Sequence, residues 1–539
     1  MPEVAGSVFF GQARDRLTAS RWWLALLSGG LQALALSPWV AGLHAALPAV
    51  LQTAAAAWLV CLLAGQTKVR AAALVAWLHA SVWLVGATGW MFVSLHHFGG
   101  LPAWLSALAV ALLCLALSGY MALAGAVWQR FRCGSPWRDA TLFGGLWLLA
   151  ELARALIFTG FPWGASGYAL IDTPWALLAP WVGVYGLGCI WATLVALAAL
   201  GAFGTPRHTK ARWLMPLPLL GLSIGLAAWS PAPHTHPHGQ PLKVALLQSN
   251  VAQDEKFDAR MLGNMLVWHG QQLQQVQADL VVAPETAIPL LPEQLPEGYW
   301  DGLRAMFGSG QGRAALIGMP LGSLESGYTN SVVGLSPELA QPYRYDKHHL
   351  VPFGEFIPPF FKWFTAMMNI PLGDFNRGVV GQPSFAWAGQ RIAPNICYED
   401  LFGEELGARF IDPAQAPTVF VNFSNIGWFG DTVAIDQHLQ ISRMRALEFE
   451  RPMVRATNTG ATAIIDHRGV VTHQLARTTR GVLKGEVQGR GVDAQSGWAI
   501  TPYAWWVSRW GLWPLWLVGV LVFALAVWAR NRGMGARRH

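Results

Sequence analysis

The hydrophobic pattern divides the chain into a long apolar part, a polar middle and a short apolar end. Seven apolar stretches precede residue 231, and an eighth lies near the C-terminus. Each has about the 20 residues that a helix needs to cross the hydrocarbon core of a membrane. The pattern therefore predicts a membrane α-helical bundle of about eight transmembrane helices. The expected spans cover approximately residues 21–39, 41–63, 70–94, 103–128, 138–158, 178–203, 212–230 and 508–529.

The positions of lysine and arginine predict the orientation of these helices. Basic residues precede the first span, follow the second, fourth and sixth spans, and follow the last one. These residues are Arg14, Arg16, Arg21, Lys68, Arg70, Arg130, Arg132, Arg138, Arg207, Lys210, Arg212, Arg530, Arg532, Arg537 and Arg538. The alternate loops, around 96–102 and 159–177, contain no lysine or arginine. Because cytoplasmic loops are enriched in basic residues, we expect both termini in the cytoplasm and the polar middle outside. In a bacterium this is a multi-pass protein of the inner membrane with a periplasmic domain, and the first span is an uncleaved anchor.

Composition supports an integral membrane protein that carries a polar domain. The chain has 539 residues, of which 53% are hydrophobic and 12% are charged, whereas soluble domains have about 25% charged residues. The net charge of +7 belongs mostly to residues that flank apolar stretches, so we expect no nucleic-acid partner. We divide the chain into a seven-helix bundle (1–230), a linker (231–241), a catalytic domain (242–492) and a return segment with the eighth helix and a tail (493–539).

Short apolar runs that alternate with helical patterns predict an α/β fold for the polar middle. Strands are expected at 242–248, 278–284, 314–318, 418–422 and 461–465, and helices at 258–276 and 433–450. The preceding segment 231–239 is rich in proline and carries three alternating histidines. A flexible linker is the better interpretation than a metal site, since no second cluster of ligands accompanies the histidines.

Cys397 is the only cysteine of the polar middle, because Cys61, Cys114, Cys133 and Cys189 all lie in or beside the apolar part. A lone thiol there is either an inert buried side chain or a nucleophile, and on its own the inert reading is favoured.

Two further polar residues near the ends of apolar runs favour the interpretation of Cys397 as a nucleophile. Glu285 follows the strand expected at 278–284, and Lys347 precedes the sequence Leu350-Val-Pro-Phe-Gly-Glu355. A carboxylate base, an ammonium and a thiol are the groups needed for acyl transfer through a thioester. The spacing alone does not establish that the three groups meet.

Several motifs resemble those of known families. Pro284-Glu285-Thr286, Lys347 with Leu350–Glu355, and Ile396-Cys397-Tyr398-Glu399 are similar to the Glu-Lys-Cys signature of the nitrilase superfamily. Four further segments, 158–163, 422–429, 443–448 and 455–460, resemble the apolipoprotein N-acyltransferases, and this resemblance extends over nearly the whole chain.

The resemblance implies a nitrilase-like α-β-β-α sandwich on the helix bundle. It implies transfer of a fatty acyl chain from a phospholipid, through a thioester on Cys397, to the α-amino group of a diacylglyceryl cysteine in an apolipoprotein. This reaction needs neither a cofactor nor a metal. The resemblance assigns the base to Glu285, the oxyanion stabiliser to Lys347, an essential acid to Glu355, and supporting positions to Tyr398 and Glu399.

Two departures from the family pattern occur: Gln248-Ser249-Asn250 replaces the common Gln-Gly-Asn, and Asn425-Ile-Gly-Trp-Phe429 lacks the usual acidic residue. They put local loop geometry in doubt but leave the three catalytic positions intact.

Five side chains near the expected site or in the expected membrane spans have two interpretations each. Phe257, Trp428 and Phe429 are candidates for contact with an acyl chain, and plain core packing or anchoring explains them nearly as well. Glu151 and Arg154 lie three residues apart in the fifth span, where a structural ion pair is favoured over a lining of a lipid groove.

Two alternatives to acyl transfer remain. A membrane-tethered amidase of the nitrilase type would use the same three groups with water as the acceptor. A transporter or lipid-binding scaffold with an inactive outer domain would have no need of Glu285, Lys347 and Cys397 together.

Overall fold

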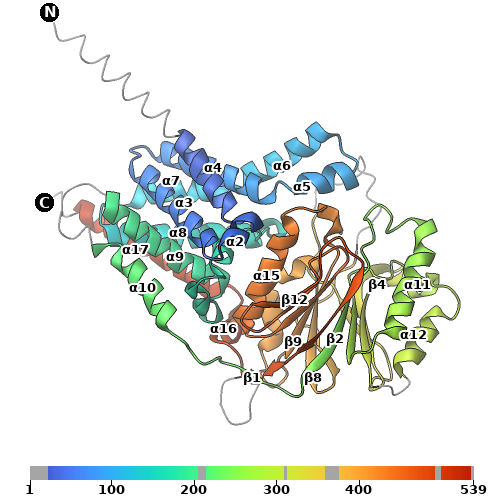
Figure 1. The fold of residues 1–539 in the computed structure, drawn as a ribbon. Helices are drawn as coiled ribbons and strands as arrows, with labels where there is room; N and C mark the ends of the chain where they lie inside the picture. The colour runs from blue at the N-terminus through green and yellow to red at the C-terminus, as the bar shows by residue number, and fades with distance from the viewer. Residues whose placement is uncertain (1–21, 204–213, 309–311, 358–374, 492–498, 536–539) are drawn as a thin grey trace, which may run out of the picture.

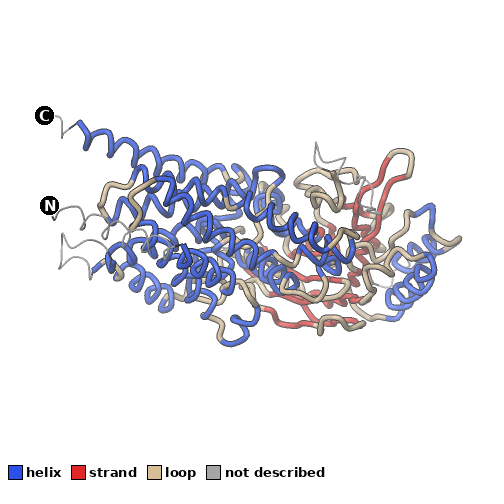
Figure 2. Tube along the Cα trace, turned by 90° about the horizontal axis from the view of Figure 1, so that it is seen from above, coloured by secondary structure: helices blue, strands red, loops and turns tan. Residues whose placement is uncertain are grey.

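The computed structural model describes residues 22–203, 214–308, 312–357, 375–491 and 499–535. A helical part and a part built on two β-sheets lie side by side, with the strands gathered at one end of the molecule in both views (Figures 1 and 2). Arg14, Arg16, Arg21, Arg207, Lys210, Arg212, Arg537 and Arg538 lie outside the described residues.

Six helices among the described residues are long and apolar enough to cross a membrane. They are α3 (Leu47–Ala64), α4 (Val69–Thr88), the consecutive pair α6 (Ala103–Leu117) and α7 (Gly119–Phe131), α8 (Pro136–Leu156), α9 (Ala179–Phe203) and α17 (Trp513–Gly535). The first and seventh expected spans correspond to shorter apolar helices, Trp22–Leu34 and α10 (Leu217–Ala228). The expected count of eight is therefore approximate.

Prolines explain where the second expected span departs from the structure. Pro38 begins the short helix α2 (Pro38–Leu43), and Pro48 lies in the first turn of α3. Proline fits the first turn of a helix, where its missing N–H is not needed, but it interrupts a continuous helix. The span expected from residue 41 consequently begins at Leu47.

The polar middle forms two six-stranded sheets. The first has the order β13 (Gly481–Val487), β2 (Leu242–Gln248), β3 (Leu280–Ala283), β4 (Ala314–Ser323), β5 (Gly327–Leu335), β6 (Tyr343–Asp346). The second has the order β12 (Val471–Gln474), β11 (Ala463–Ile465), β10 (Met453–Thr457), β9 (Val419–Ser424), β8 (Gln390–Ile396), β7 (Phe385–Trp387). Strands β2, β3 and β4 are parallel to one another, as are β8, β9 and β10.

The two sheets pack face to face between layers of helices. Leu246, Val282 and Phe423 are among the fully buried residues of the core between the sheets. Helices α11 (Ala259–Gln275) and α12 (Tyr299–Gly308) cover the outer face of the first sheet, and α15 (Ala434–Phe449) covers the second (Figure 1). This is the predicted α-β-β-α sandwich. The core beneath α15 continues into the membrane helices without a break.

The strands and helices expected in the polar middle are present, with ends shifted by a few residues. The strand predicted at 242–248 has those bounds, and the helix predicted at 258–276 is α11, with Asp258 accepting a hydrogen bond from Arg260 N at its N-cap. The segment predicted as a linker is held against the sandwich: β1 (His236–Pro237) pairs with β14 (Arg490–Gly491), and Thr235 N donates to Glu450.

Candidate active site

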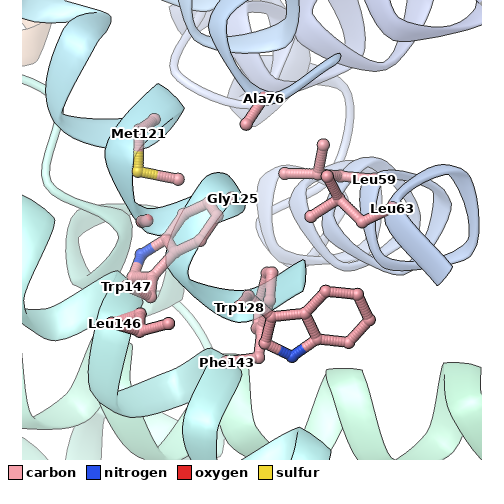
Figure 3. Close-up of a pocket in the computed structure, with 10 residues that line it drawn as sticks. Leu59, Leu63, Ala76, Met121, Gly125, Trp128, Phe143, Leu146 and Trp147 are labelled. Carbon is pink, nitrogen blue, oxygen red and sulfur yellow. The ribbon is translucent and has the colours of Figure 1, made fainter. Parts of the chain in front are cut away.

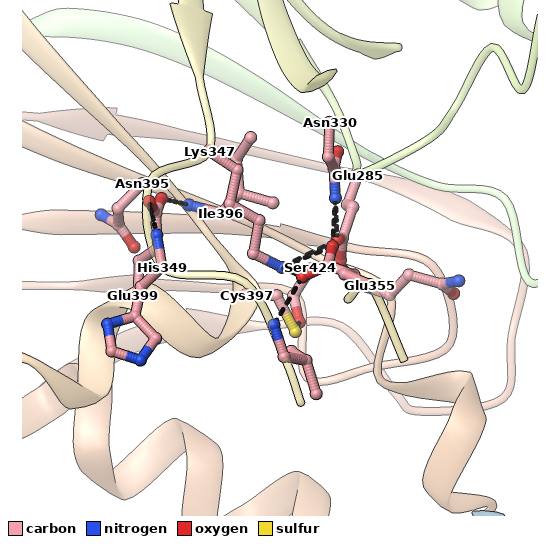
Figure 4. Close-up of polar contacts among 12 residues, drawn as sticks. Glu285, Asn330, Lys347, His349, Glu355, Asn395, Ile396, Cys397, Glu399 and Ser424 are labelled. Carbon is pink, nitrogen blue, oxygen red and sulfur yellow. Dashed lines mark hydrogen bonds and ion pairs between the residues drawn. The ribbon is translucent and has the colours of Figure 1, made fainter. Parts of the chain in front are cut away.

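Three strands from two sheets end at the candidate site. Glu285 lies two residues beyond β3, Lys347 directly follows β6, and Cys397 directly follows β8 (Figure 4). Ligand and catalytic groups collect at the carboxyl ends of parallel strands because the loops there converge. The fold thus brings together side chains that lie at least fifty residues apart in the sequence.

Lys347 lies between two carboxylates. Its Nζ is 2.8 Å from Glu355 Oε2 and 3.6 Å from Glu285 Oε1. Asn330 Nδ2 donates to Oε1 of both glutamates at 2.8 Å. The main-chain N–H of Asn425, just beyond β9, donates to the other oxygen of Glu285 at 2.8 Å. These contacts together fix the carboxylate of Glu285 and the ammonium of Lys347 relative to each other.

The charge of Lys347 is maintained by these neighbours. Burial opposes the charge of its ammonium, but Glu355 and then Glu285 outweigh burial and raise the pKa of the lysine. The side chain is 1% exposed, so water does not screen it. Lys347 is a permanent cation at neutral pH and can stabilise an anion that forms beside it.

Cys397 occupies a strained turn. Its φ angle is +51°, a left-handed conformation that costs a non-glycine residue about 1–3 kcal/mol. Asn422 Nδ2 and His438 Nε2 lie 3.3 Å and 3.1 Å from its carbonyl oxygen and hold the turn. Ser424 Oγ donates to Sγ at 3.4 Å. The turn points the thiol toward Lys347 and Glu285 (Figure 4).

The thiol of Cys397 is neutral at physiological pH. Burial and, next, the charge of Glu285 raise its pKa to about 12, against the opposing effects of Lys347 and Ser424. A nucleophilic thiolate must therefore be made during the reaction by transfer of the proton to a base. Glu285 is a carboxylate close enough for its charge to act on this thiol.

Glu399 ties the turn of Cys397 to the loop of Lys347. Its Oε2 accepts from Ile396 N and Tyr345 Oη, both at 2.7 Å. Its Oε1 accepts from the main-chain N–H of His348 and His349, at 2.7 Å and 3.2 Å. One carboxylate therefore fixes residues beside both Lys347 and Cys397.

A loop of the membrane part contacts two residues of the site, Tyr398 next to Cys397 and His349 just after Lys347. Tyr398 Oη donates to the carbonyl of Gly160 at 3.1 Å, and His349 Nε2 lies 3.0 Å from the carbonyl of Thr159. Both carbonyls belong to the loop after α8, within the motif 158–163. The site is thus in direct contact with the helix bundle.

The expected ion pair between Glu151 and Arg154 is wrong. Among the described residues the two side chains form no direct salt bridge, and each bonds instead to the loop after α8. Glu151 Oε1 accepts from Ser166 N at 2.7 Å, while Arg154 donates to the carbonyls of Phe161 and Trp163. The main chain of this loop offers both donors and acceptors, so each side chain has partners other than the opposite charge, while Glu151 Oε2 and Arg154 Nη2 make no hydrogen bond among the described residues.

The three aromatic residues proposed for substrate contact are half-buried. The ring of Trp428 packs edge-on against Phe98, and Phe429 lies 4.3 Å from Trp90 between ring centroids. Both therefore join the sandwich to the membrane helices. Phe257 lies in the turn before α11, directly after Lys256.

Sequence reasoning missed two polar residues of the site. Asn330 lies in β5, where it bridges Glu285 and Glu355, and no motif distinguished it from other strand residues. Lys256 donates from Nζ to the main-chain carbonyl of Glu285 at 2.9 Å. A lysine next to the candidate Phe257 was visible in the sequence, but its burial was not.

Two hollows in the described part of the chain bear on the site and the membrane helices. One of about 280 Å³ is lined partly by Gln253, which accepts a hydrogen bond from Asn425 Nδ2, and it borders the loops that hold Glu285. The other is an apolar gap of about 10 Å³ between membrane helices, lined by residues such as Leu63 and Trp147 (Figure 3). It is too small for a substrate. No group of three or more His, Cys, Asp or Glu side chains within the described ranges is arranged for a metal ion.

Comparison with known families decides the assignment. The model of the apolipoprotein N-acyltransferase N-terminal domain matches residues 28–198, and the carbon-nitrogen hydrolase model matches residues 243–495. A protein of Verminephrobacter eiseniae named apolipoprotein N-acyltransferase is 61% identical over 453 residues, which cover 82% of this chain and 84% of that protein. The chain belongs to the apolipoprotein N-acyltransferase family.

A second curated relative supports the same family. A Ralstonia nicotianae protein of the same name is 43% identical, and the match covers 90% of each chain. An amidase from Nesterenkonia sp. is similar at a TM-score of 0.34 with 16% identity, over 47% of this chain and 91% of that one.

The departure from the family pattern at Ser249 is accommodated locally. Its hydroxyl donates to Asn458 Oδ1 at 2.9 Å, and Asn458 also accepts from the main-chain N–H of Val251. The serine thus adds a hydrogen bond to the loop after β2.

Proposed function

We propose that the chain transfers a fatty acyl chain from a phospholipid, through a thioester on Cys397, to the α-amino group of the diacylglyceryl cysteine of apolipoproteins. The observation that carries this proposal is the cluster of Glu285, Lys347 and Cys397. The lysine lies 3.6 Å from the base, and both charges act on the thiol. Membership of the family supports the acyl-transfer reaction.

In the first half-reaction, Glu285 takes the proton of Cys397 as sulfur attacks the ester carbonyl of the phospholipid. Lys347 stabilises the oxyanion that forms, and Glu355 keeps the lysine charged and in place. The carbon–oxygen bond then breaks, and the proton passes from Glu285 to the departing lyso-phospholipid.

In the second half-reaction, the α-amine of the acceptor attacks the thioester carbonyl. Glu285 takes a proton from the amine, the carbon–sulfur bond breaks, and the proton returns to the thiolate. Glu399 and Tyr398 support both steps by holding the loops of Lys347 and Cys397.

Both substrates are lipids anchored in a membrane, which suits a site that touches the helix bundle through Gly160. The cellular location we propose is the bacterial inner membrane, with the catalytic domain (242–492) in the periplasm and both termini in the cytoplasm. Phe257, Trp428 and Phe429 remain proposed contacts for apolar parts of these substrates. No cofactor enters the proposed reaction.

The competing function is a membrane-tethered amidase that uses water as the acceptor. Its three catalytic groups would be the same. The contacts of Tyr398 and His349 with the membrane loop favour a lipid substrate over a small soluble amide.

Thioester formation tests the proposal directly. Purified full-length protein is incubated with phospholipid alone, and its intact mass is measured before and after addition of a diacylglyceryl-cysteine lipopeptide. We expect one acyl chain on the protein, lost on addition of the lipopeptide as the peptide gains it. Cys397→Ala should remain unmodified, whereas Cys133→Ala, a change at an exposed cysteine, should behave as wild type.

Acylation of the Cys397→Ala protein would place the nucleophile elsewhere. Release of free fatty acid without acylation of the lipopeptide would favour a hydrolase.

A further inference from the structure

Lys256 is a second buried lysine beside the catalytic carboxylate. It is 2% exposed and lies in the turn between β2 and α11. The one hydrogen bond that its ammonium makes among the described residues is the 2.9 Å contact with the main-chain carbonyl of Glu285. An ammonium has three donors, so this side chain is buried without using its full bonding capacity.

Holding such a charge is costly. A buried cation without full compensation is unfavourable because it has lost its hydration. Burial lowers the pKa of Lys256 to about 8, although Glu285 and then Cys397 act to raise it. His269 of α11 is a further titratable group that interacts with it. The nearby negative charge that favours the ammonium therefore comes from the catalytic groups themselves.

The carbonyl that Lys256 holds lies at a constrained point of the backbone. Thr286, the next residue, has a φ angle of +51°. On the other side, a Cβ at Gly318 would lie 2.8 Å from Glu285 Cα and 2.3 Å from the carbonyl oxygen of Pro284. The backbone of Glu285 is thus packed against β4 on one side and tied by Lys256 through its carbonyl.

We propose that Lys256 is a positioning residue for Glu285, holding its main-chain carbonyl and giving its carboxylate a second cation besides Lys347. This inference rests on the proposed function, in which Glu285 is the base. The other groups near this carboxylate are Glu355, Cys397, the side-chain amide of Asn330 and the main-chain N–H of Asn425. The positive charge favours the ionised carboxylate, which is the form that can accept a proton from the thiol.

The test separates the hydrogen bond of Lys256 from its charge. Lys256→Gln keeps an N–H donor for the carbonyl but removes the charge, Lys256→Arg keeps both, and Lys256→Met removes both. The rate of thioester formation from phospholipid is measured by intact mass between pH 5 and 9 for each full-length variant. Arg313→Met is the matched control, because Arg313 is also a buried cation that donates to main-chain carbonyls. Its acceptors are Gln274, in the last turn of α11, and Val276, which directly follows that helix.

With the cation removed, protonation of the base becomes easier, so the acidic limb of the rate profile should move to higher pH. We expect a shift of about one pH unit in Lys256→Gln, and a loss on the order of 10- to 100-fold in rate at pH 7 in Lys256→Met. Lys256→Arg should restore the wild-type limb, and Arg313→Met should leave its position unchanged. If Lys256→Met does not fold, Lys256→Gln decides the matter.

A Lys256→Gln protein with an unshifted limb overturns the inference, whether its rate is normal or reduced. A wild-type protein that forms no thioester would instead overturn the proposed function. The two failures are thus distinguishable.

Discussion

Glu399 accepts four hydrogen bonds beside the turn that carries Cys397. Its two oxygens join the main chain before the nucleophile to the main chain after Lys347. A glutamine has the same shape, but one of its two positions is an N–H₂ donor. In Glu399→Gln, the amide nitrogen would therefore face either Ile396 N–H and Tyr345 O–H or the two N–H groups of His348 and His349.

We expect Glu399→Gln to lower the free energy of unfolding by about 1–3 kcal/mol, the usual cost of leaving buried polar groups unsatisfied. Thioester formation should also slow, because the loops of Lys347 and Cys397 lose their common tie. Thermal unfolding in detergent and intact mass measure the two effects. Glu338→Gln is the control, since Glu338 is exposed. Equal stability of the two variants would show that Glu399 does not tie the loops.

Single residues of the site were predictable only where a motif carried them. Glu285 followed an expected strand, and Glu285, Lys347 and Cys397 all belonged to a recognisable signature; the structure brings the three together. Asn330 and Lys256 are ordinary residue types in ordinary surroundings along the sequence, and their importance arises from contacts with Glu285 across the fold. The wrong pairing of Glu151 with Arg154 has the same origin. Helical spacing made them neighbours, but each side chain bonds instead to the loop beyond the helix.

At the scale of elements, α15 is the helix that connects the sandwich to the membrane part. Gln437 Oε1 accepts from the indole N–H groups of Trp90 and Trp163, at 3.1 Å and 2.7 Å, and its Nε2 donates to the carbonyl of Leu36 at 3.3 Å. Trp90 and Trp163 lie 4.7 Å apart between ring centroids, and Trp90 also packs on Phe429. One side chain of α15 thus fixes three segments of the helical part.

Replacing Gln437 with leucine should weaken this junction. The change preserves volume but removes the partner of the Trp163 indole and of the Leu36 carbonyl, while the Trp90 indole keeps only its hydrogen bond to the carbonyl of Ala87. We therefore expect a loss of about 1–3 kcal/mol in the free energy of unfolding. Differential scanning calorimetry of the protein in detergent checks this, and a broader or split transition would show that the two parts have become less coupled. Gln274→Leu, on the exposed surface of α11, should leave the transition as in wild type. An unchanged transition in Gln437→Leu would mean that the shared apolar core alone joins the parts.

The presence of a helix or strand was easier to predict than the residues at which it ends or the length of a membrane helix. The strand at 242–248 and the helix that became α11 followed directly from periodicity. Apolar composition, however, does not distinguish one continuous helix from two short ones. Hydropathy alone joined stretches that the structure divides. The divisions occur at the prolines at 38 and 48 and at the short helices α5 (Met91–Val93) and η1 (Ser94–Phe98).

At the scale of the whole molecule, basic side chains collect at one end of the helix bundle. Arg132 donates to the carbonyls of Ala64 and Gln66, which places the end of α7 beside the loop between α3 and α4. The guanidinium of Arg530, near the end of α17, lies 5.7 Å from the ring centroid of Phe131. In both views this end of α17 points away from the strands (Figures 1 and 2).

This arrangement predicts on which side of the membrane each part lies. Positively charged loops stay in the cytoplasm, so the end with Arg132 and Arg530 should face the cytoplasm and the sandwich should lie outside. A reporter that is active only outside the cytoplasm should therefore work when placed after Gly239, which lies beside the sandwich. The same reporter should be inactive after Arg132 or at the C-terminus.

A second reporter, active only in the cytoplasm, should give the opposite result at all three positions and controls for poor expression. Activity of the first reporter at the C-terminus but not after Gly239 would reverse the orientation. The catalytic thiol would then face the cytoplasm, away from lipoproteins exported across the membrane.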